Sequence, residues 1–221
     1  MGSIAAILRK DLTLEVRGAG STISLVVFSI LVLTVLVIAF GPSPSSAETA
    51  AGTLWVALIF SGALGASRAI AAEREDGAIY ALLLSPVDTG AIFAAKFAAA
   101  FIFIGVAEAA ALVLVALFFG LDFSTTLLRL GAILLLGAFG FAAIGTLLAA
   151  ISTRTRIGDL LLPLLVIPTF VPALIGGVKA TVAVLSRAPL ADVAVWLRII
   201  IAFDILYAVA GYLLFDYVVG E

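Results

Sequence analysis

Cysteine and histidine are both absent from the 221 residues of the chain, and the only methionine is Met1. Without thiols or imidazoles the chain cannot build a disulfide, a zinc-thiolate site or a His-dependent catalytic triad. Haem iron could not be held by His, Cys or an internal Met either. We therefore expect no metal site, no catalytic residues and no cofactor bound by this chain itself.

Charged residues are also scarce, at 12% of the sequence, whereas 64% of residues are hydrophobic and the mean hydropathy is +1.33. Soluble domains carry about 25% charged residues. The formal net charge of −2 gives no reason to expect a nucleic-acid partner. This composition predicts an all-α integral membrane protein that has membrane lipid as its solvent.

Six segments are long and apolar enough to be transmembrane helices, which need about 20 mostly apolar residues. They are Thr22 to Phe40, Thr49 to Ile70, Ile92 to Phe118, Thr125 to Ile151, Leu160 to Lys179 and Val193 to Val219. The connections between them are short, so we predict a single membrane domain over residues 1–221. The N-terminus does not resemble a cleavable signal, because Asp11 and Glu15 precede the first long apolar run.

Basic residues concentrate on one side of these six predicted spans. Eight of them fall before the first span or around the second and fourth connections, and three fall on the other side. The eight are Arg9, Lys10, Arg17, Arg68, Arg74, Lys96, Arg154 and Arg156, and the three are Arg129, Lys179 and Arg187. The positive-inside rule then predicts a bacterial inner-membrane protein with both termini in the cytoplasm.

The N-terminal segment, residues 1–18, is predicted to be an amphipathic helix at the membrane interface. Ser3 can cap it, and Ile4, Leu8, Leu12 and Val16 recur at helical spacing. Asp11 and Glu15 project into the same arc as these apolar residues. We therefore expect this helix to contact protein rather than lipid alone, with a simple helical lead-in as the alternative.

The second span carries small residues at four-residue spacing, Ser61, Gly65 and Ala69. Small residues let helix backbones approach closely. The pattern fits packing within the bundle as well as a homodimer interface.

The fifth span contains Pro163, Pro168 and Pro172, followed by Gly176 and Gly177. Each proline removes one backbone donor and crowds the preceding turn. We expect a kinked or broken helix, which could either border a pathway or serve as an ordinary packing device.

Three intramembrane polar residues are candidates for function. Glu108 lies near the middle of the third span, and Asp204 lies near the middle of the sixth. An acidic group at the bilayer centre costs about 2.5 to 3.5 kcal/mol, so neither should face lipid. Arg198 is six residues before Asp204, which favours an interhelical partner over a pair within the helix. Each acid is either a polar tie between helices or a group that faces substrate.

The second connection, residues 68–90, is the most informative stretch of the chain. An acidic cluster is followed by a glycine that can end a helix and then by an apolar run too short to span. Its key members are Glu73, Glu75, Asp76, Gly77, Leu82, Leu84 and Pro86. A solvated loop has no need of a run of leucines, so the pattern indicates a short surface helix that docks a basic partner.

These residues resemble the coupling helix of ABC-2-type exporter permeases, which contacts the ATPase. The chain itself has no G-x-x-x-x-G-K-[ST] loop for nucleotide phosphates. Over essentially its whole length it is most similar to the haem exporter protein B family, the CcmB permeases of cytochrome c maturation. The similarity includes Gly41-Pro42-x-Pro44, Gly52 with Trp55-Val56-Ala57, and Leu162-Pro163-Leu164 with Pro168. The chain departs from the family pattern at Ser43, where Glu is common, and at Pro172.

The resemblance implies a homodimeric, non-catalytic permease bound to two copies of a cytoplasmic ABC ATPase. It also implies a haem-handling membrane protein and a small single-span subunit as partners. ATP would be hydrolysed by the partner to release a haem-loaded periplasmic chaperone or to export haem. Two alternatives stay open: an ABC-2-type exporter permease for another hydrophobic substrate, and an ion-coupled transporter that uses Glu108 and Asp204.

Overall fold

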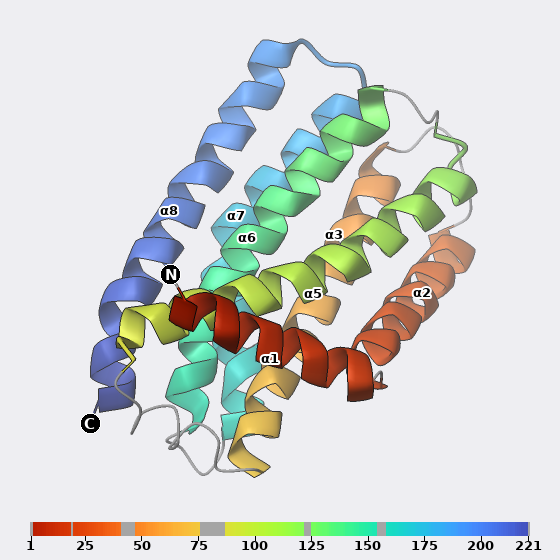
Figure 1. Ribbon diagram of the computed structural model, residues 1–221. Coiled ribbons are helices and arrows are strands. Elements are labelled where there is room, and N and C mark those ends of the chain that lie inside the picture. The colour runs from red at the N-terminus through yellow and green to blue at the C-terminus, as the bar shows by residue number, and fades with distance from the viewer. Residues whose placement is uncertain are drawn as a thin grey trace.

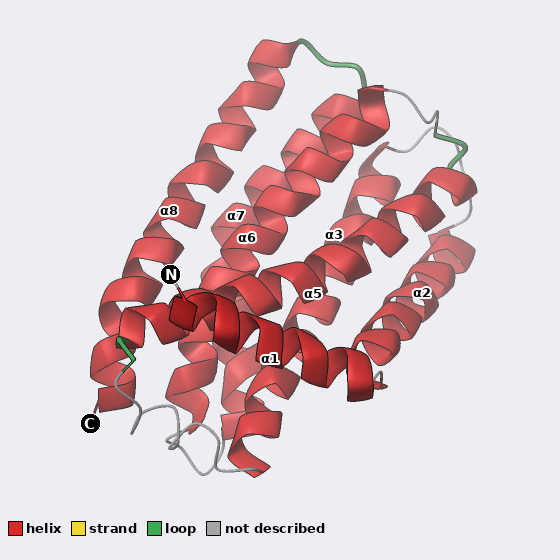
Figure 2. Cartoon of the chain, viewed as in Figure 1, coloured by secondary structure: helices red, strands yellow, loops and turns green. Residues whose placement is uncertain are grey.

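The computed structural model describes residues 2–18, 20–40, 47–75, 87–121, 125–153 and 158–220. Within these ranges the chain forms seven α-helices, and Figure 2 shows no strand among them. They are α1 (Gly2–Gly18), α2 (Gly20–Phe40), α3 (Ala47–Glu75), α5 (Thr89–Phe118), α6 (Thr125–Thr153), α7 (Gly158–Leu185) and α8 (Leu190–Gly220). The all-α prediction is thereby confirmed.

Four of these helices are long and apolar enough to cross a membrane. They are Thr89–Phe118, Thr125–Ser152, Leu164–Leu185 and Leu190–Val218, while Val26–Phe40 and Ala47–Ala63 are shorter apolar stretches. A helix satisfies its backbone donors and acceptors internally, which is what a segment in lipid requires. The chain is therefore an integral membrane protein.

Helix α6 occupies the centre of the bundle, where it contacts α3, α5, α7 and α8 (Figure 1). Helix α2 packs on α3 and α5 at one side of the bundle. Helix α1 lies across α5 instead of running along the bundle. We call the end of the bundle that holds α1, the start of α5 and the end of α8 the α1 end.

The core is built around Trp55, an indole on α3 that is fully buried. Its ring lies against Gly137 of α6 and Gly177 of α7, two positions where a side chain would collide with it. The indole Nε1 donates a hydrogen bond to the Thr181 hydroxyl of α7 at 3.0 Å. Glycines at these sites allow three helices to close on one aromatic ring.

The fifth span was predicted to be kinked or broken, and the break is ruled out because α7 is continuously helical from Gly158 to Leu185, while the kink stays a prediction. Each proline removes only one donor, and polar groups on neighbouring positions and helices can satisfy the carbonyls around it. Separately, the Tyr207 hydroxyl of α8 donates a hydrogen bond to the Thr169 carbonyl, which joins α8 to α7. The helix also continues past Lys179, so this lysine lies within α7 and not in a connection.

Candidate functional site

Helix α1 is attached to α5 by an ion pair whose two side chains are largely shielded from solvent. Lys96 Nζ lies 2.7 Å from Asp11 Oδ2, and the two side chains are 15% and 12% exposed. Ile7 of α1 is buried in a cluster with Ile92 and Phe93 of α5. The expectation that this helix contacts protein is therefore confirmed.

The packed stripe of α1 differs from the one inferred from the sequence. Ile7 and Asp11, four residues apart, face α5, whereas Leu8 and Leu12 are only partly buried. Ile4 and Asp11, which the sequence placed on the predicted arc, do lie on the packed face. The buried face is thus shifted from Leu8 and Leu12 toward Ile7.

Glu108 of α5 is 2% exposed and accepts a hydrogen bond from Ser61 of α3. The donor–acceptor distance from Ser61 Oγ to Glu108 Oε1 is 3.4 Å, which is long for a hydroxyl donor. Glu108 Oε2 is buried with no hydrogen-bond partner among the described residues. Glu108 thus connects α5 to α3 through one of its two oxygens.

Asp204 of α8 is 3% exposed and faces the backbone of α6. Its Oδ1 occupies the space that a side chain at Gly140 would need. Neither carboxylate oxygen has a hydrogen-bond partner within the part of the chain that the structure describes. Asp204 therefore makes no tie to another helix there, in contrast to Glu108.

Two aromatic rings pack together beside Asp204. The Phe141 and Phe170 rings meet edge to face with centroids 5.0 Å apart. A Cβ at Gly140, where Asp204 lies, would be 3.5 Å from Phe170. A Cβ at Gly62 of α3 would lie 2.6 Å from the Phe141 ring. These contacts join α3, α6 and α7 close to Asp204 of α8.

The side chain of Arg198 is exposed on α8. It forms no ion pair with the residues described, so its interhelical partner stays a prediction. Of the α7 prolines, Pro168 is exposed and Pro172 is partly buried. The side chain of Pro163 lies outside the described part of the structure.

The coupling residues are placed only in part. Glu73 and Glu75 fall in the last turn of α3, which reaches the α1 end (Figure 1), but their side chains are not among those described. Asp76, Gly77, Leu82, Leu84 and Pro86 lie outside the described residues. Their proposed role stays a prediction. No group of His, Cys, Asp and Glu in the described ranges could hold a metal ion.

Asp204→Ala is expected to leave the free energy of unfolding unchanged or to raise it by about 1 to 3 kcal/mol, because it removes a buried carboxylate that lacks a partner. Thermal unfolding of the purified protein in detergent measures the change. Asp192→Ala, an exposed acid on the same helix, is the matched control and should shift stability by less than about 0.5 kcal/mol. A clear loss of stability in Asp204→Ala would show that this carboxylate has a stabilising partner.

The sequence profile of the CcmB protein family matches residues 3–214. Among curated proteins, Heme exporter protein B of Rhodobacter capsulatus is 33% identical over 175 residues, which cover 79% of this chain and 80% of the relative. Heme exporter protein B of Pseudomonas aeruginosa is 30% identical over 192 residues, or 86% of each chain. Heme exporter protein B of Paracoccus denitrificans is 32% identical over 176 residues, 79% of this chain and 80% of the relative. The chain belongs to the CcmB family.

Proposed function

We propose that this chain is the permease subunit of a haem exporter that acts in cytochrome c maturation. The observation that carries this proposal is the family match over residues 3–214, which includes every described helix apart from the two ends of the chain. The relatives, from three different bacteria, are all named Heme exporter protein B. An all-helical, strongly apolar fold is what a membrane permease requires.

Six transmembrane spans are the topology that we propose, with both termini in the cytoplasm of a bacterial cell and the chain in its inner membrane. Helix α2 has 21 residues, and at about 1.5 Å per residue it reaches roughly the 30 Å of the hydrocarbon core. Helix α3, with 29 residues, is longer still. These lengths support α2 and α3 as spans beside the four longer apolar helices.

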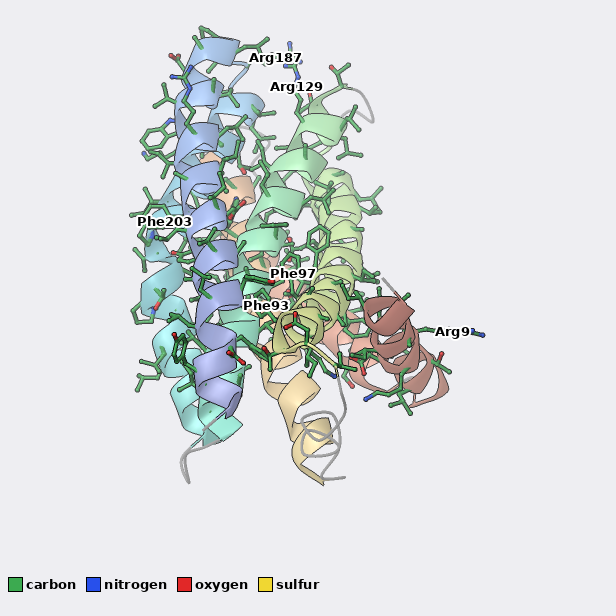
Figure 3. All side chains as sticks on the ribbon, turned by 60° about the vertical axis from the view of Figure 1, so that its left-hand side comes forward. Arg9, Phe93, Phe97, Arg129, Arg187 and Phe203 are labelled. Atoms are coloured by element: carbon green, nitrogen blue, oxygen red, sulfur yellow. The ribbon has the colours of Figure 1, made fainter. Side chains whose placement is uncertain are left out.

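The placement of basic side chains supports this orientation. Arg9 projects away from the bundle at the α1 end, and Arg129 and Arg187 lie at the opposite end (Figure 3). Lys96 and Lys10 also belong to the α1 end. Because Lys179 lies within α7, the far side has fewer basic residues in its connections than the sequence alone suggested. The positive-inside rule then favours the α1 end as the cytoplasmic one.

A separate ABC ATPase is the partner that we propose for the α1 end. Helix α3 continues past its apolar part to Glu75. The next described helix, α5, begins at the same end of the bundle with Thr89. Because both flanking helices reach the α1 end, we expect the coupling residues Asp76, Gly77, Leu82, Leu84 and Pro86 to meet the ATPase there. ATP would be hydrolysed by that partner, and this chain would be non-catalytic.

The wider assembly in our proposal is a homodimer of this chain with two ATPase copies, a haem-handling membrane protein and a small single-span subunit. Haem would be held by a partner, since this chain has no His, no Cys and no internal Met to ligate the iron. The chain would instead convert ATP hydrolysis into release of a haem-loaded periplasmic chaperone or into haem export. Energy coupling is the role that its composition favours.

Affinity purification of the tagged chain from a mild detergent extract, followed by mass spectrometry, tests this function. We expect an ABC ATPase and a haem-binding membrane protein to copurify with it. An ATPase without any haem-binding protein would favour an exporter of another hydrophobic substrate. Recovery of no ATPase would contradict the proposal and favour an ion-coupled transporter.

A further inference from the structure

The first turns of α5 and the last turns of α8 interlock at the α1 end through two reciprocal contacts. A Cβ at Gly90 of α5 would lie 2.5 Å from the ring of Tyr212 on α8. In return, the ring of Phe93 on α5 occupies the space beside Gly211 of α8. Each helix thus presents a glycine to an aromatic ring of the other, which brings the two backbones into close approach.

A polar contact and a small core reinforce this junction. The Thr89 hydroxyl donates a hydrogen bond to Asp216 Oδ1 at 2.8 Å. The Phe93 and Phe215 rings pack with centroids 5.5 Å apart, and both are buried in a cluster that also contains Ile7 of α1. We call the residues Thr89, Gly90, Phe93, Gly211, Tyr212, Phe215 and Asp216 the α5–α8 junction.

The junction has few degrees of freedom. The buried Phe93 ring and the exposed Tyr212 ring, each set against a glycine backbone, cannot slide by a small amount without collision, because packed interfaces resist continuous deformation. Further along α8, about two turns from Gly211, Asp204 lies against Gly140 of α6. A displacement of the start of α5 would therefore be passed to α8 and through it to the central helix.

We propose that the α5–α8 junction makes these two helix ends move as one unit, so that motion produced by ATP hydrolysis and entering at the start of α5 is transmitted to α8. Thr89, Phe93 and Asp216 are positioning residues in this proposal. It rests on the proposed function, since it requires an ATPase that acts at this end. Helix α5 directly follows the coupling segment in the sequence, and the junction joins α8 to it.

Covalent cross-linking tests whether the helices move together. Because the chain has no native cysteine, the variant Thr89→Cys with Asp216→Cys allows one defined disulfide or short bismaleimide link. We would assemble the complex with a cysteine-free ATPase in lipid nanodiscs and measure ATP hydrolysis before and after linking. The unlinked variant lacks the Thr89–Asp216 hydrogen bond and is expected to hydrolyse ATP about fivefold more slowly than the wild type, and linking should restore a rate within twofold of the wild type. A further tenfold loss on linking that reduction of the disulfide reverses would overturn the proposal, because the helices would then have to separate.

Loosening the junction gives the complementary result. Asp216→Val removes the acceptor of the hydrogen bond, and Phe93→Ala removes the buried ring. Both variants are expected to keep bound ATPase but to lower permease-dependent hydrolysis by about fivefold, which corresponds to about 1 kcal/mol. Asp216→Asn retains an acceptor oxygen and should restore the wild-type rate. Full activity in both loosened variants would overturn the inference.

Copurification separates this inference from the function on which it rests. If the wild-type chain recovers no ATPase, the proposed function fails and the inference fails with it. If the wild-type chain recovers the ATPase and the loosened variants hydrolyse ATP at the full rate, only the junction's role is overturned. Thermal unfolding of each variant checks that it is folded. If Phe93→Ala does not fold, the ATP hydrolysis rate of Asp216→Val, a change at an exposed site, still tests the inference.

Discussion

Gly177→Val is expected to destabilise the folded protein by about 3 kcal/mol, at the upper end of the range for overpacked cores. A Cβ at this position would overlap the Cζ2 and Cη2 atoms of Trp55. The indole cannot retreat, because a Cβ at Gly137 on α6 would already lie only 2.6 Å from its Cη2 atom. Its Nε1 is also held by the hydrogen bond to Thr181.

Unfolding of the purified protein in detergent, followed by heat or by a denaturing detergent, measures this loss. Gly52→Ala is the matched control on α3, since no atom lies within 4 Å of a Cβ there and it should not destabilise the protein. In the double variant Gly177→Val with Trp55→Ala, the two changes should cost less together than their sum. Additive losses would show that the valine does not collide with the indole.

The sequence was sufficient to predict the helical fold and the burial of both acids, because these follow from composition and from the cost of a charge in lipid. It could not predict that Gly137 and Gly177 lie against the Trp55 ring. The indole and Thr181 are 126 residues apart, so only the tertiary arrangement brings them together. A tryptophan in an apolar run carries no local signal of which glycines will surround it.

Glu108 and Asp204 show a second limit of sequence reasoning. Both were single acids in the middle of apolar spans and could not be distinguished by sequence. The structure gives Glu108 a hydroxyl donor from Ser61, which the sequence marked only as a small packing residue. The structure places the Asp204 carboxylate against the backbone of α6 at Gly140, which has no side chain. Which neighbour each acid meets depends on helix rotation, and helix rotation is determined by packing across the whole bundle.

The proline-rich helix shows how far a local rule can be taken. Pro163, Pro168 and Pro172 predicted a kinked or broken helix, and the structure excludes the break because α7 is continuous through all three. The other residues of the helix keep their donors, and α6 and α8 pack along it. In a membrane, an open backbone would leave polar groups in hydrocarbon, so continuity is favoured over a break. A bend in the axis of α7 stays a prediction.

The charge reversal Glu73→Lys with Glu75→Lys is expected to reduce recovery of the ATPase by about 100-fold. Coupling between close opposite charges at interfaces is worth about 1.5 to 7 kcal/mol, and reversal replaces attraction by repulsion. A loss near 3 kcal/mol corresponds to about 100-fold in affinity. Both residues lie in the final turn of α3, after its apolar stretch Ala47–Ala63, so we expect the fold to tolerate the change.

Glu48→Lys provides the matched control for this variant, because it reverses an exposed acid on the same helix at its opposite end. It should leave ATPase recovery unchanged while altering the net charge in the same direction. Raising the salt concentration should weaken ATPase binding to the wild-type chain, since exposed charge pairs are screened within about 8 Å at physiological ionic strength. Equal ATPase recovery from the wild type, the control and the Glu73→Lys/Glu75→Lys variant would show that the acidic turn of α3 does not dock the partner. The coupling role would then have to come from the apolar residues that follow, where Leu82 and Leu84 offer a hydrophobic contact insensitive to salt.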